Sequence, residues 1–373
     1  MRFGIGDVRR FPVPSAFCKN NQRNAHVLSK HGCGVEQPAP AAKSVTSRNI
    51  PASALLMILS TICVLLITSL AADIGFRKQS AAPRVDDPLQ VRLGYPPDAK
   101  LLIINADDLG VAHSEDVATF TALDKNLVSS ATVMVPCPWF TEVAAYAKSH
   151  PQADLGLHLT LTSEWDTYRW APVAPRALVS SLVGGDGNFY PDTDGVATHA
   201  RPDQVEIELR AQIERAKSAG LNPSHLDAHM HALYRTPELF DVLLKVAHDY
   251  KLPVRMARND ELFSSKIAQM QRYDPNSLIL DAIYSPGADV PADHWVDNYV
   301  NLIRSLQPGV TEVFVHLAHD DAETQAIMIN HADWGATWRQ REFDAMSNPA
   351  IRKALQENHV TIIGWRNIKK LAG

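Results

Sequence analysis

The sequence predicts an α/β fold: a single (β/α) barrel of the TIM type, with seven or eight strands and some irregularity, over residues 99–373. Strand-like and helix-like stretches alternate along this region, which is typical of a mostly parallel sheet. The region also has about the length that one such barrel requires. No G-x-G-x-x-G follows the first predicted strand, so the sequence does not support a dinucleotide-binding site.

The predicted strands are short apolar runs, and helices are expected between most of them. The strands are residues 100–108, 129–136, 154–162, 224–230, 253–257, 277–284, 311–318 and 360–365. The clearest helices are residues 114–126, 139–150, 202–220 and 236–251. Pro202 near the start of the third helix and Gly220 after its end favour these boundaries. A polar, glycine-rich insertion covers residues 163–201, between the third strand and this helix.

Three segments precede the predicted barrel. Residues 1–50 form a basic leader without apolar periodicity, which we expect to be disordered or removed. Residues 51–72 carry no charge and predict either a signal peptide or a transmembrane anchor. A buried core helix is the less favoured alternative, because core helices rarely lack polar residues on every face. Residues 73–98 predict a polar linker.

The apolar segment decides the predicted localisation. Both favoured interpretations place the barrel outside the cytoplasm, as an exported, periplasmic or extracellular protein. A cleavage-like end at residues 69–71, or initiation at a later residue such as Met57, favours the signal peptide. An uncleaved segment would anchor the protein in the membrane by a single span.

Charge and cysteine content narrow the class of protein. The net charge is −5, and residues before Pro51 carry eight Lys/Arg against two Asp/Glu, which leaves −11 for the rest of the chain. Such an acidic body argues against nucleic acid as the chief partner. Of the four cysteines, only Cys137 lies in the predicted barrel, so we expect no internal disulfide there.

Residues 224–231, SHLDAHMH, place four ionisable side chains at strict alternation: His225, Asp227, His229 and His231. Alternation predicts a strand with all four on one face. Because a strand rises about 3.3 Å per residue, its outer histidines would lie roughly 20 Å apart, too far to share one metal ion. At most two neighbours can therefore bind one ion, and the other ligands must come from elsewhere. Burying so many polar groups for structural reasons alone would be costly.

Further ionisable residues fall near the carboxyl-terminal ends of predicted strands, where such barrels have their active sites. Asp107 and Asp108 end the first strand, although they would also suit the cap of the next helix. For both to reach the site, the backbone must leave the pleat, and Gly110 makes such a break plausible. The other candidates are His158, Arg255 and His316, each of which could instead be a core or surface residue. Two histidines and a carboxylate would make a metal site with open positions for water.

These motifs resemble those of the YdjC-like carbohydrate deacetylases, the family of chitooligosaccharide deacetylase. Three of them resemble the family in order and spacing: NADDLG (105–110), GLHLTLT (156–162) and SHLDAHMH (224–231). Two weaker ones are DGNFYPD (186–192) and IIGWRNI (362–368), the latter with Asn367 where the family has aspartate. VFVHLA (313–318) stands where the family has a Cys-His-Pro-Gly type segment. Val315 and Leu317 replace the cysteine and proline there, which weakens the carry-over onto His316.

The resemblance implies a metal-dependent hydrolase that removes acetyl groups from N-acetylated sugars or oligosaccharides. A divalent ion, Mg²⁺ or Zn²⁺, would be held by Asp108, His158 and His229, and Asp107 would be the general base for a metal-bound water. We take His316 as the acid that protonates the departing amine. The residues expected to position these groups or to contact substrate are His225, Asp227, His231 and Arg255.

Alternative functions remain open from the sequence. One is a metal-dependent hydrolase of another amide or ester, because a fold does not fix a substrate. Another is an inactive, exported carbohydrate-binding protein. Family members often pair, so a homodimer is a further prediction.

Overall fold

The computed structural model describes residue 84 and residues 86–287, 290–331 and 333–372. The predicted leader, residues 1–50, and the apolar segment, residues 51–72, lie outside these residues. Within the described part of the chain, no helix is both long and apolar enough to cross a bilayer. The prediction of an exported or membrane-anchored protein rested on residues 51–72 alone; on this finding it is corrected and is not carried further.

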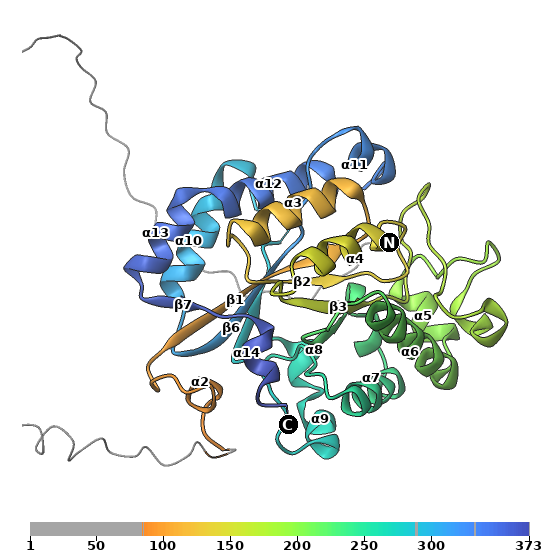
Figure 1. Cartoon of the computed structure of the whole chain (residues 1–373), viewed down its shortest axis with the longest axis horizontal. Helices are drawn as coiled ribbons and strands as arrows, with labels where there is room; N and C mark the ends of the chain where they lie inside the picture. Colours follow the sequence, from red (N-terminus) through yellow and green to blue (C-terminus); the bar gives the residue numbers. More distant parts are fainter. Residues whose placement is uncertain (1–83, 85, 288–289, 332, 373) are drawn as a thin grey trace, which may run out of the picture. The chain divides into compact units, whose positions relative to one another are not determined.

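The described residues build a curled parallel sheet with helices around it (Figure 1). Its strands are β1 (Lys100–Leu109), β2 (Ser130–Val133), β3 (Leu155–Leu159), β4 (Leu226–Ala228), β5 (Ala282–Tyr284), β6 (Gly309–Val315) and β7 (Val360–Ile362). The strand order is β4-β3-β2-β1-β6-β5, and β7 pairs with the first residues of β1. All but the first residue of β1 are buried, so this strand forms the centre of the core.

The predicted barrel is confirmed as a curled, barrel-like α/β sheet. Between β4 and β5, pairing consists of isolated bridges, Leu226 with Val254 and Ala257 with Leu280. The predicted strand 253–257 is therefore not a regular strand, and Pro253 at its start has no N–H to donate to a ladder. Closure of the sheet into a complete barrel stays a prediction.

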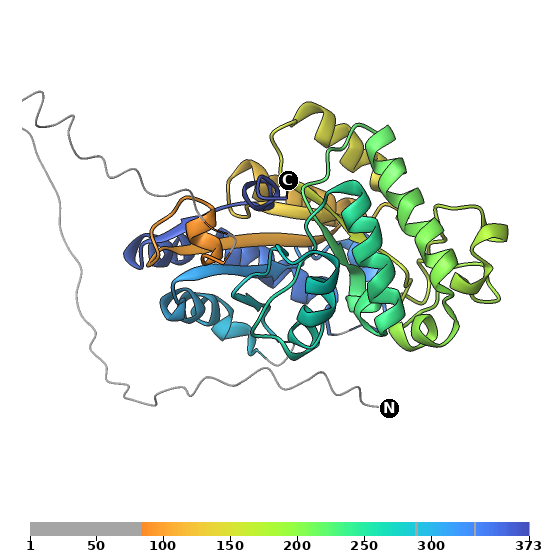
Figure 2. The ribbon, with the colours of Figure 1, turned by 90° about the horizontal axis from the view of Figure 1, so that it is seen from below.

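The four helices predicted most clearly are present, with ends within two residues of the expected ones. They are α3 (His113–Asp124), α4 (Phe140–Ser149), α6 (Pro202–Ser218) and α7 (Pro237–Tyr250). The others are α2 (Leu89–Arg92), α5 (Thr193–His199), α8 (Glu261–Ser264), α9 (Ile267–Tyr273), α10 (Trp295–Ser305), α11 (Ala322–Ile327), α12 (Ala336–Ser347), α13 (Pro349–Glu357) and α14 (Trp365–Lys369). Helix α2 falls within the predicted linker, and its Leu89 and Gln90 are buried. Figure 2 shows the same helices around the sheet from below.

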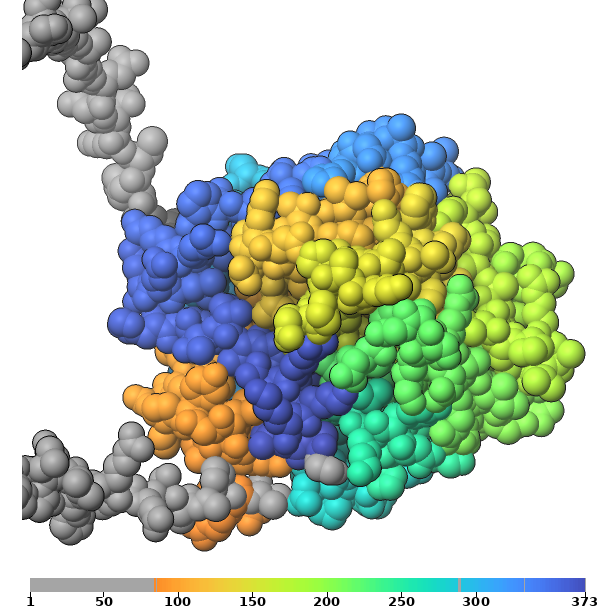
Figure 3. Space-filling view, viewed as in Figure 1, coloured from red at the N-terminus to blue at the C-terminus, as the bar shows by residue number. Residues whose placement is uncertain are grey.

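The predicted insertion, residues 163–201, is folded against the body. It contains α5 and two short 3₁₀ helices, Arg176–Leu178 and Ser180–Leu182. Buried Glu208 of α6 accepts hydrogen bonds from the backbone N–H groups of Val173 and Ala174, at 3.0 and 2.9 Å. In the space-filling view the insertion (yellow-green) lies on the side away from α2 (orange) (Figure 3).

The structure corrects the prediction of a long strand through SHLDAHMH. Strand β4 ends at Ala228, and His229 begins the 3₁₀ helix η3 (His229–Tyr234). Met230 and His231 have φ angles of 49° and 56°, in the left-handed region that strands do not use. The chain therefore turns just after His229, and His231 does not continue the alternating row.

Candidate metal centre

The first motif, at the end of β1, departs from regular strand geometry as expected. Asp108 has a φ of 66°, unusual for a residue other than glycine, and Gly110 has 98°. The register between β1 and β2 also shifts between Ala106 and Leu109. This break lets the neighbouring Asp107 and Asp108 face the same polar cluster instead of opposite sides of the sheet.

Three predicted metal ligands, Asp108, His158 and His229, converge from β1, β3 and the start of η3. Asp108 Oδ1 lies 3.3 Å from His158 Nε2 and 3.2 Å from His229 Nδ1. The three donor atoms lie within 4.8 Å of one another, and all three residues are buried. Three segments far apart in the sequence thus place a carboxylate and two imidazoles around one point.

The outer partners of the two imidazoles determine which nitrogen of each ring is free. Asp227 Oδ1 lies 2.6 Å from His158 Nδ1, a contact that follows from the register of β3 and β4, which pairs the two residues. Both Glu164 oxygens lie 3.1 Å from His229 Nε2. An ionised carboxylate only accepts hydrogen bonds, so these nitrogens carry the hydrogens. In the neutral rings, the nitrogens that face Asp108, His158 Nε2 and His229 Nδ1, are therefore the ones with a free lone pair.

The local charges favour a cation at this point. Burial alone would lower the pKa of His158, but Asp227, Asp107 and Asp108 raise it to about 10. Burial likewise opposes the charged form of His229, yet Glu164 and Asp108 raise its pKa to about 9. Asp108 Oδ1 is buried and has no hydrogen-bond donor. Positive charge is thus favoured between the rings, and a divalent cation suits the donor set as well as protons do.

Asp107 lies beside this cluster and is held by Arg255. Arg255 Nη1 and Nη2 donate to Asp107 Oδ1 and Oδ2 at 2.9 and 3.0 Å. Oδ1 also accepts from Asn105 Nδ2 at 2.7 Å and from Thr132 Oγ1 at 3.2 Å. Burial alone would raise the pKa of Asp107, but Arg255 and His158 hold it well below its usual range. Asp107 is therefore ionised, and Oδ2 keeps a lone pair beyond its single bond to Arg255.

A second group of donors, Asp107, His158 and Asp227, is also close enough to surround an ion. Arg255 already occupies the space between its carboxylates, because Nη1 lies 2.9 Å from Asp107 Oδ1 and 2.8 Å from Asp227 Oδ2. The His158 nitrogen that faces this group is the one that carries a hydrogen. A second cation would therefore meet a guanidinium and an N–H, so the Asp108 group is the better metal site.

His316 lies at the end of β6, as predicted, with 13% of its side chain exposed. Its backbone N–H donates to buried Glu342 at 2.5 Å, and its Nδ1 lies 3.6 Å from the same carboxylate oxygen. The ring lies against Trp334 and Trp338, with centroid distances of 5.5 Å to each. His316 is also among the groups that lower the pKa of Asp107.

The other two histidines of SHLDAHMH do not join the cluster. His225 stacks on Trp365 at 4.3 Å, and Gly156 leaves room for its ring, since a Cβ there would meet it at 2.4 Å. His231 packs edge-on against Tyr234 and Phe263. Burial lowers the pKa of His225 to about 3 and that of His231 to about 4, so both rings are neutral. A role of either residue in positioning the site or contacting substrate stays a prediction.

Two residues of the cluster were not predicted from the sequence. Glu164 contacts His229 and lies two residues after the strand-three motif, so its position past a strand end was an available signal. Arg339 of α12 lies 2.9 Å from Asp108 Oδ2 and 2.8 Å from Glu115 Oε1. No motif or periodicity marks Arg339, because only the packing of α12 against α3 brings it to the site.

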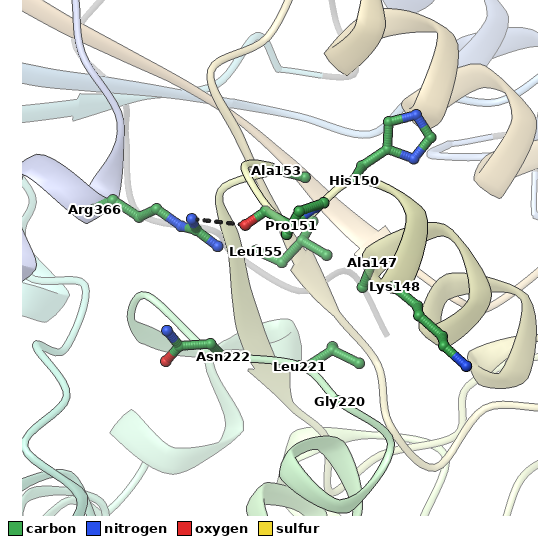
Figure 4. A pocket seen from close by; sticks show the side chains of 10 residues that line it. All are labelled: Ala147, Lys148, His150, Pro151, Ala153, Leu155, Gly220, Leu221, Asn222 and Arg366. Atoms are coloured by element: carbon green, nitrogen blue, oxygen red, sulfur yellow. Dashed lines mark hydrogen bonds between the residues drawn. The ribbon is translucent and has the colours of Figure 1, made fainter.

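The opposite end of the sheet carries a surface pocket instead of a charged cluster. This pocket has a volume of about 370 Å³ and is lined by residues before β3, residues after α6, and Arg366 of α14 (Figure 4). Arg366 Nη1 donates to the Pro151 carbonyl at 3.1 Å. None of the predicted site residues lines the pocket, so it is separate from the cluster.

The region that holds these motifs is similar to a known protein family. The family model described as "YdjC-like protein" matches residues 101–357, which include the whole cluster. The chain belongs to the YdjC-like family. The expected resemblance is thereby confirmed.

Curated relatives match nearly over their whole length. A carbohydrate deacetylase from Brevibacillus brevis is 37% identical over 271 residues, covering 72% of this chain and 99% of the relative. A carbohydrate deacetylase from Geobacillus stearothermophilus is 30% identical over 273 residues, covering 72% of this chain and 98% of the relative.

Among solved structures, a crystal structure of a proposed cellobiose-phosphate cleavage protein from Enterococcus faecalis V583 is similar, with a TM-score of 0.61 and 24% identity. The match covers 72% of this chain and 99% of that one. At this identity the likeness supports the fold alone.

Proposed function

We propose that this protein is a carbohydrate deacetylase, a hydrolase that removes acetyl groups from N-acetylated sugars or oligosaccharides. The observation that carries the proposal is the convergence of Asp108, His158 and His229 next to a separate, ionised carboxylate, Asp107. The names of the curated relatives support the substrate class. The predicted homodimer stays a prediction.

A divalent ion, Mg²⁺ or Zn²⁺, would be held by Asp108, His158 and His229. The unpartnered Asp108 Oδ1 and the two ring lone pairs support this assignment. When bound, such an ion supplies a Lewis acid that acidifies water and polarises a carbonyl oxygen.

Asp107 is the proposed general base, which takes a proton from the attacking water at Oδ2. Arg255, a positioning residue, fixes both oxygens and keeps the carboxylate ionised. A carboxylate with a lowered pKa is a weak base. It can therefore take a proton only from a water that the bound ion has made more acidic.

His316 is the proposed acid, which donates a proton to the departing amine nitrogen. Amide cleavage needs such a donor, because an unprotonated amine anion is a very poor leaving group. Glu342 supports this role, since its carboxylate accepts a hydrogen bond from the backbone N–H of His316 and lies 3.6 Å from its Nδ1. Asp227 is the proposed positioning residue for His158, through the 2.6 Å contact with Nδ1.

Acetate release from N-acetylglucosamine oligomers tests this function. We expect wild-type protein to release acetate, a chelator to stop it, and Asp107→Asn to lower kcat by about 10²- to 10⁴-fold while metal stays bound. Asp166→Asn, in the neighbouring loop and exposed, is the matched control and should keep wild-type activity. Acetate release at the wild-type rate in Asp107→Asn, or in the presence of chelator, would contradict the mechanism. Metal binding without turnover of any sugar would favour hydrolysis of another amide or ester.

A further inference from the structure

Glu164 contacts one of the proposed metal ligands, His229, but it belongs to none of the sequence motifs and has no role in the proposed mechanism. It lies just after β3, where the loop is fixed on both sides of it. Ser163 N–H donates to the Tyr190 carbonyl at 2.8 Å, and Ser163 Oγ accepts from Trp170 N–H at 2.9 Å. The Glu164 side chain is 16% exposed, so it borders the site instead of lying deep in the core.

The contacts of Glu164 repeat a pattern seen on the other side of the site. Its two oxygens lie 3.1 Å from His229 Nε2, while His229 Nδ1 faces Asp108. His158 has the same arrangement with its nitrogens exchanged, since Asp227 holds Nδ1 and Nε2 faces Asp108. Each imidazole therefore has one carboxylate behind it and the shared carboxylate in front of it.

We propose that Glu164 is a positioning residue for His229, which orients the ring and fixes the tautomer that can bind a metal ion. This inference rests on the metal centre of the proposed function. Carboxylates behind ligating histidines fix ring orientation and tautomer in metal sites generally. The consequence specific to this chain is that the insertion, residues 163–201, contributes to metal affinity through Glu164, its first acidic residue, which acts on His229.

Glu164 offers a cleaner test of this pattern than Asp227. Asp227 also contacts Arg255 and Thr132, so its removal would disturb the buried network around Asp107. Within the described residues, the hydrogen bonds and ion pairs of the Glu164 carboxylate are all with His229. Its side chain is also partly exposed, so a substitution leaves no large buried void.

Titration with Co²⁺, followed by the visible absorption of the bound ion, measures the effect without reference to turnover. We expect Glu164→Ala to weaken Co²⁺ binding by about 10- to 100-fold. Glu164→Gln should retain most of the affinity, because its amide oxygen still accepts the Nε2 hydrogen. Asp166→Asn is the control for a neighbouring carboxylate and should bind Co²⁺ as the wild type does. Thermal unfolding of the metal-free proteins checks that all four fold alike.

Two results would overturn the inference while leaving the metal centre intact. One is Glu164→Ala binding Co²⁺ as tightly as the wild type. The other is Glu164→Gln binding as weakly as Glu164→Ala, which would assign Glu164 as a direct ligand or as a source of charge alone. A wild-type protein that binds no Co²⁺ would overturn the metal centre itself, and this inference with it.

Discussion

His225 and His229 come from one eight-residue motif, yet the structure places them in opposite environments. His225 lies against Trp365 with its Nδ1 near Ser224 Oγ, and its pKa is lowered to about 3. His229 lies between two carboxylates, those of Asp108 and Glu164, and its pKa is raised to about 9. The motif supplies the side chains, but the neighbours from distant segments decide which histidine can bind a cation.

The same contrast extends to the two ends of the sheet. At the carboxyl-terminal end, buried carboxylates and two buried guanidinium groups, those of Arg255 and Arg339, surround the histidine pair. At the other end, the Arg366 guanidinium donates to a carbonyl beside an open pocket (Figure 4). Buried, paired charge is expensive to maintain, so its concentration at one end marks the end that has a function.

The largest expected difference is between His229→Phe and His225→Phe. Removing His229 takes away one of three proposed ligands, so we expect Co²⁺ or Zn²⁺ binding to be lost at micromolar metal. His225→Phe keeps an aromatic ring against Trp365 and should bind metal as the wild type does. Isothermal titration of both variants measures this. Equal metal affinity in the two variants would contradict the separation of the histidines.

Arg255→Met and Arg366→Met compare the two ends of the sheet in stability. The first leaves the carboxylates of Asp107, Asp227 and Glu312 buried without their cation, which should cost about 3–5 kcal/mol of unfolding free energy. The second removes one hydrogen bond to a carbonyl, which should cost about 1 kcal/mol. Urea unfolding measures both. If both variants lost a similar free energy of unfolding, the ion pairs of Arg255 would contribute no more to stability than the single hydrogen bond of Arg366.

The third comparison is the pH dependence contributed by His225. Its pKa in the folded protein, about 3, lies below the ordinary value of 6.5. Between these two pH values the unfolded chain therefore binds a proton at His225 that the folded protein does not. Its stabilising contribution is present above pH 6.5 and is lost as the pH falls toward 3, by up to about 1.4 kcal/mol per pH unit. His225→Phe should therefore lose less stability than the wild type between about pH 6.5 and about pH 4.5. Parallel pH profiles of urea unfolding would show instead that His225 is exposed or already charged.

Much of the site could be predicted from the sequence, because polar residues at the end of an apolar run mark the end of a strand. The polar residues that end apolar runs, Asp107, Asp108 and His158, face the cluster as the fold class requires. The reach of β4 was predicted wrongly, because alternation continues to His231 in the sequence while the backbone turns at Met230. Period-2 spacing reports which residues could share a face, but it does not report where a strand ends.

The missing parts of the prediction depend on tertiary packing. Arg339 reaches Asp108 from a helix more than two hundred residues further along the chain, and no local pattern encodes that contact. Residues 253–257, between β4 and β5, were predicted as a regular strand, but Pro253 and single bridges replace the ladder there. Both features are set by how segments pack and not by their own composition.

Anomalous diffraction from crystals soaked in Zn²⁺ or Mn²⁺ tests the central claim most directly. We predict one strong peak within bonding distance of Asp108 Oδ1, His158 Nε2 and His229 Nδ1, with Asp107 beside it but bound to Arg255. A peak between Asp107 and Asp227, or no peak at any of these residues, would contradict the metal centre and the hydrolytic mechanism that depends on it.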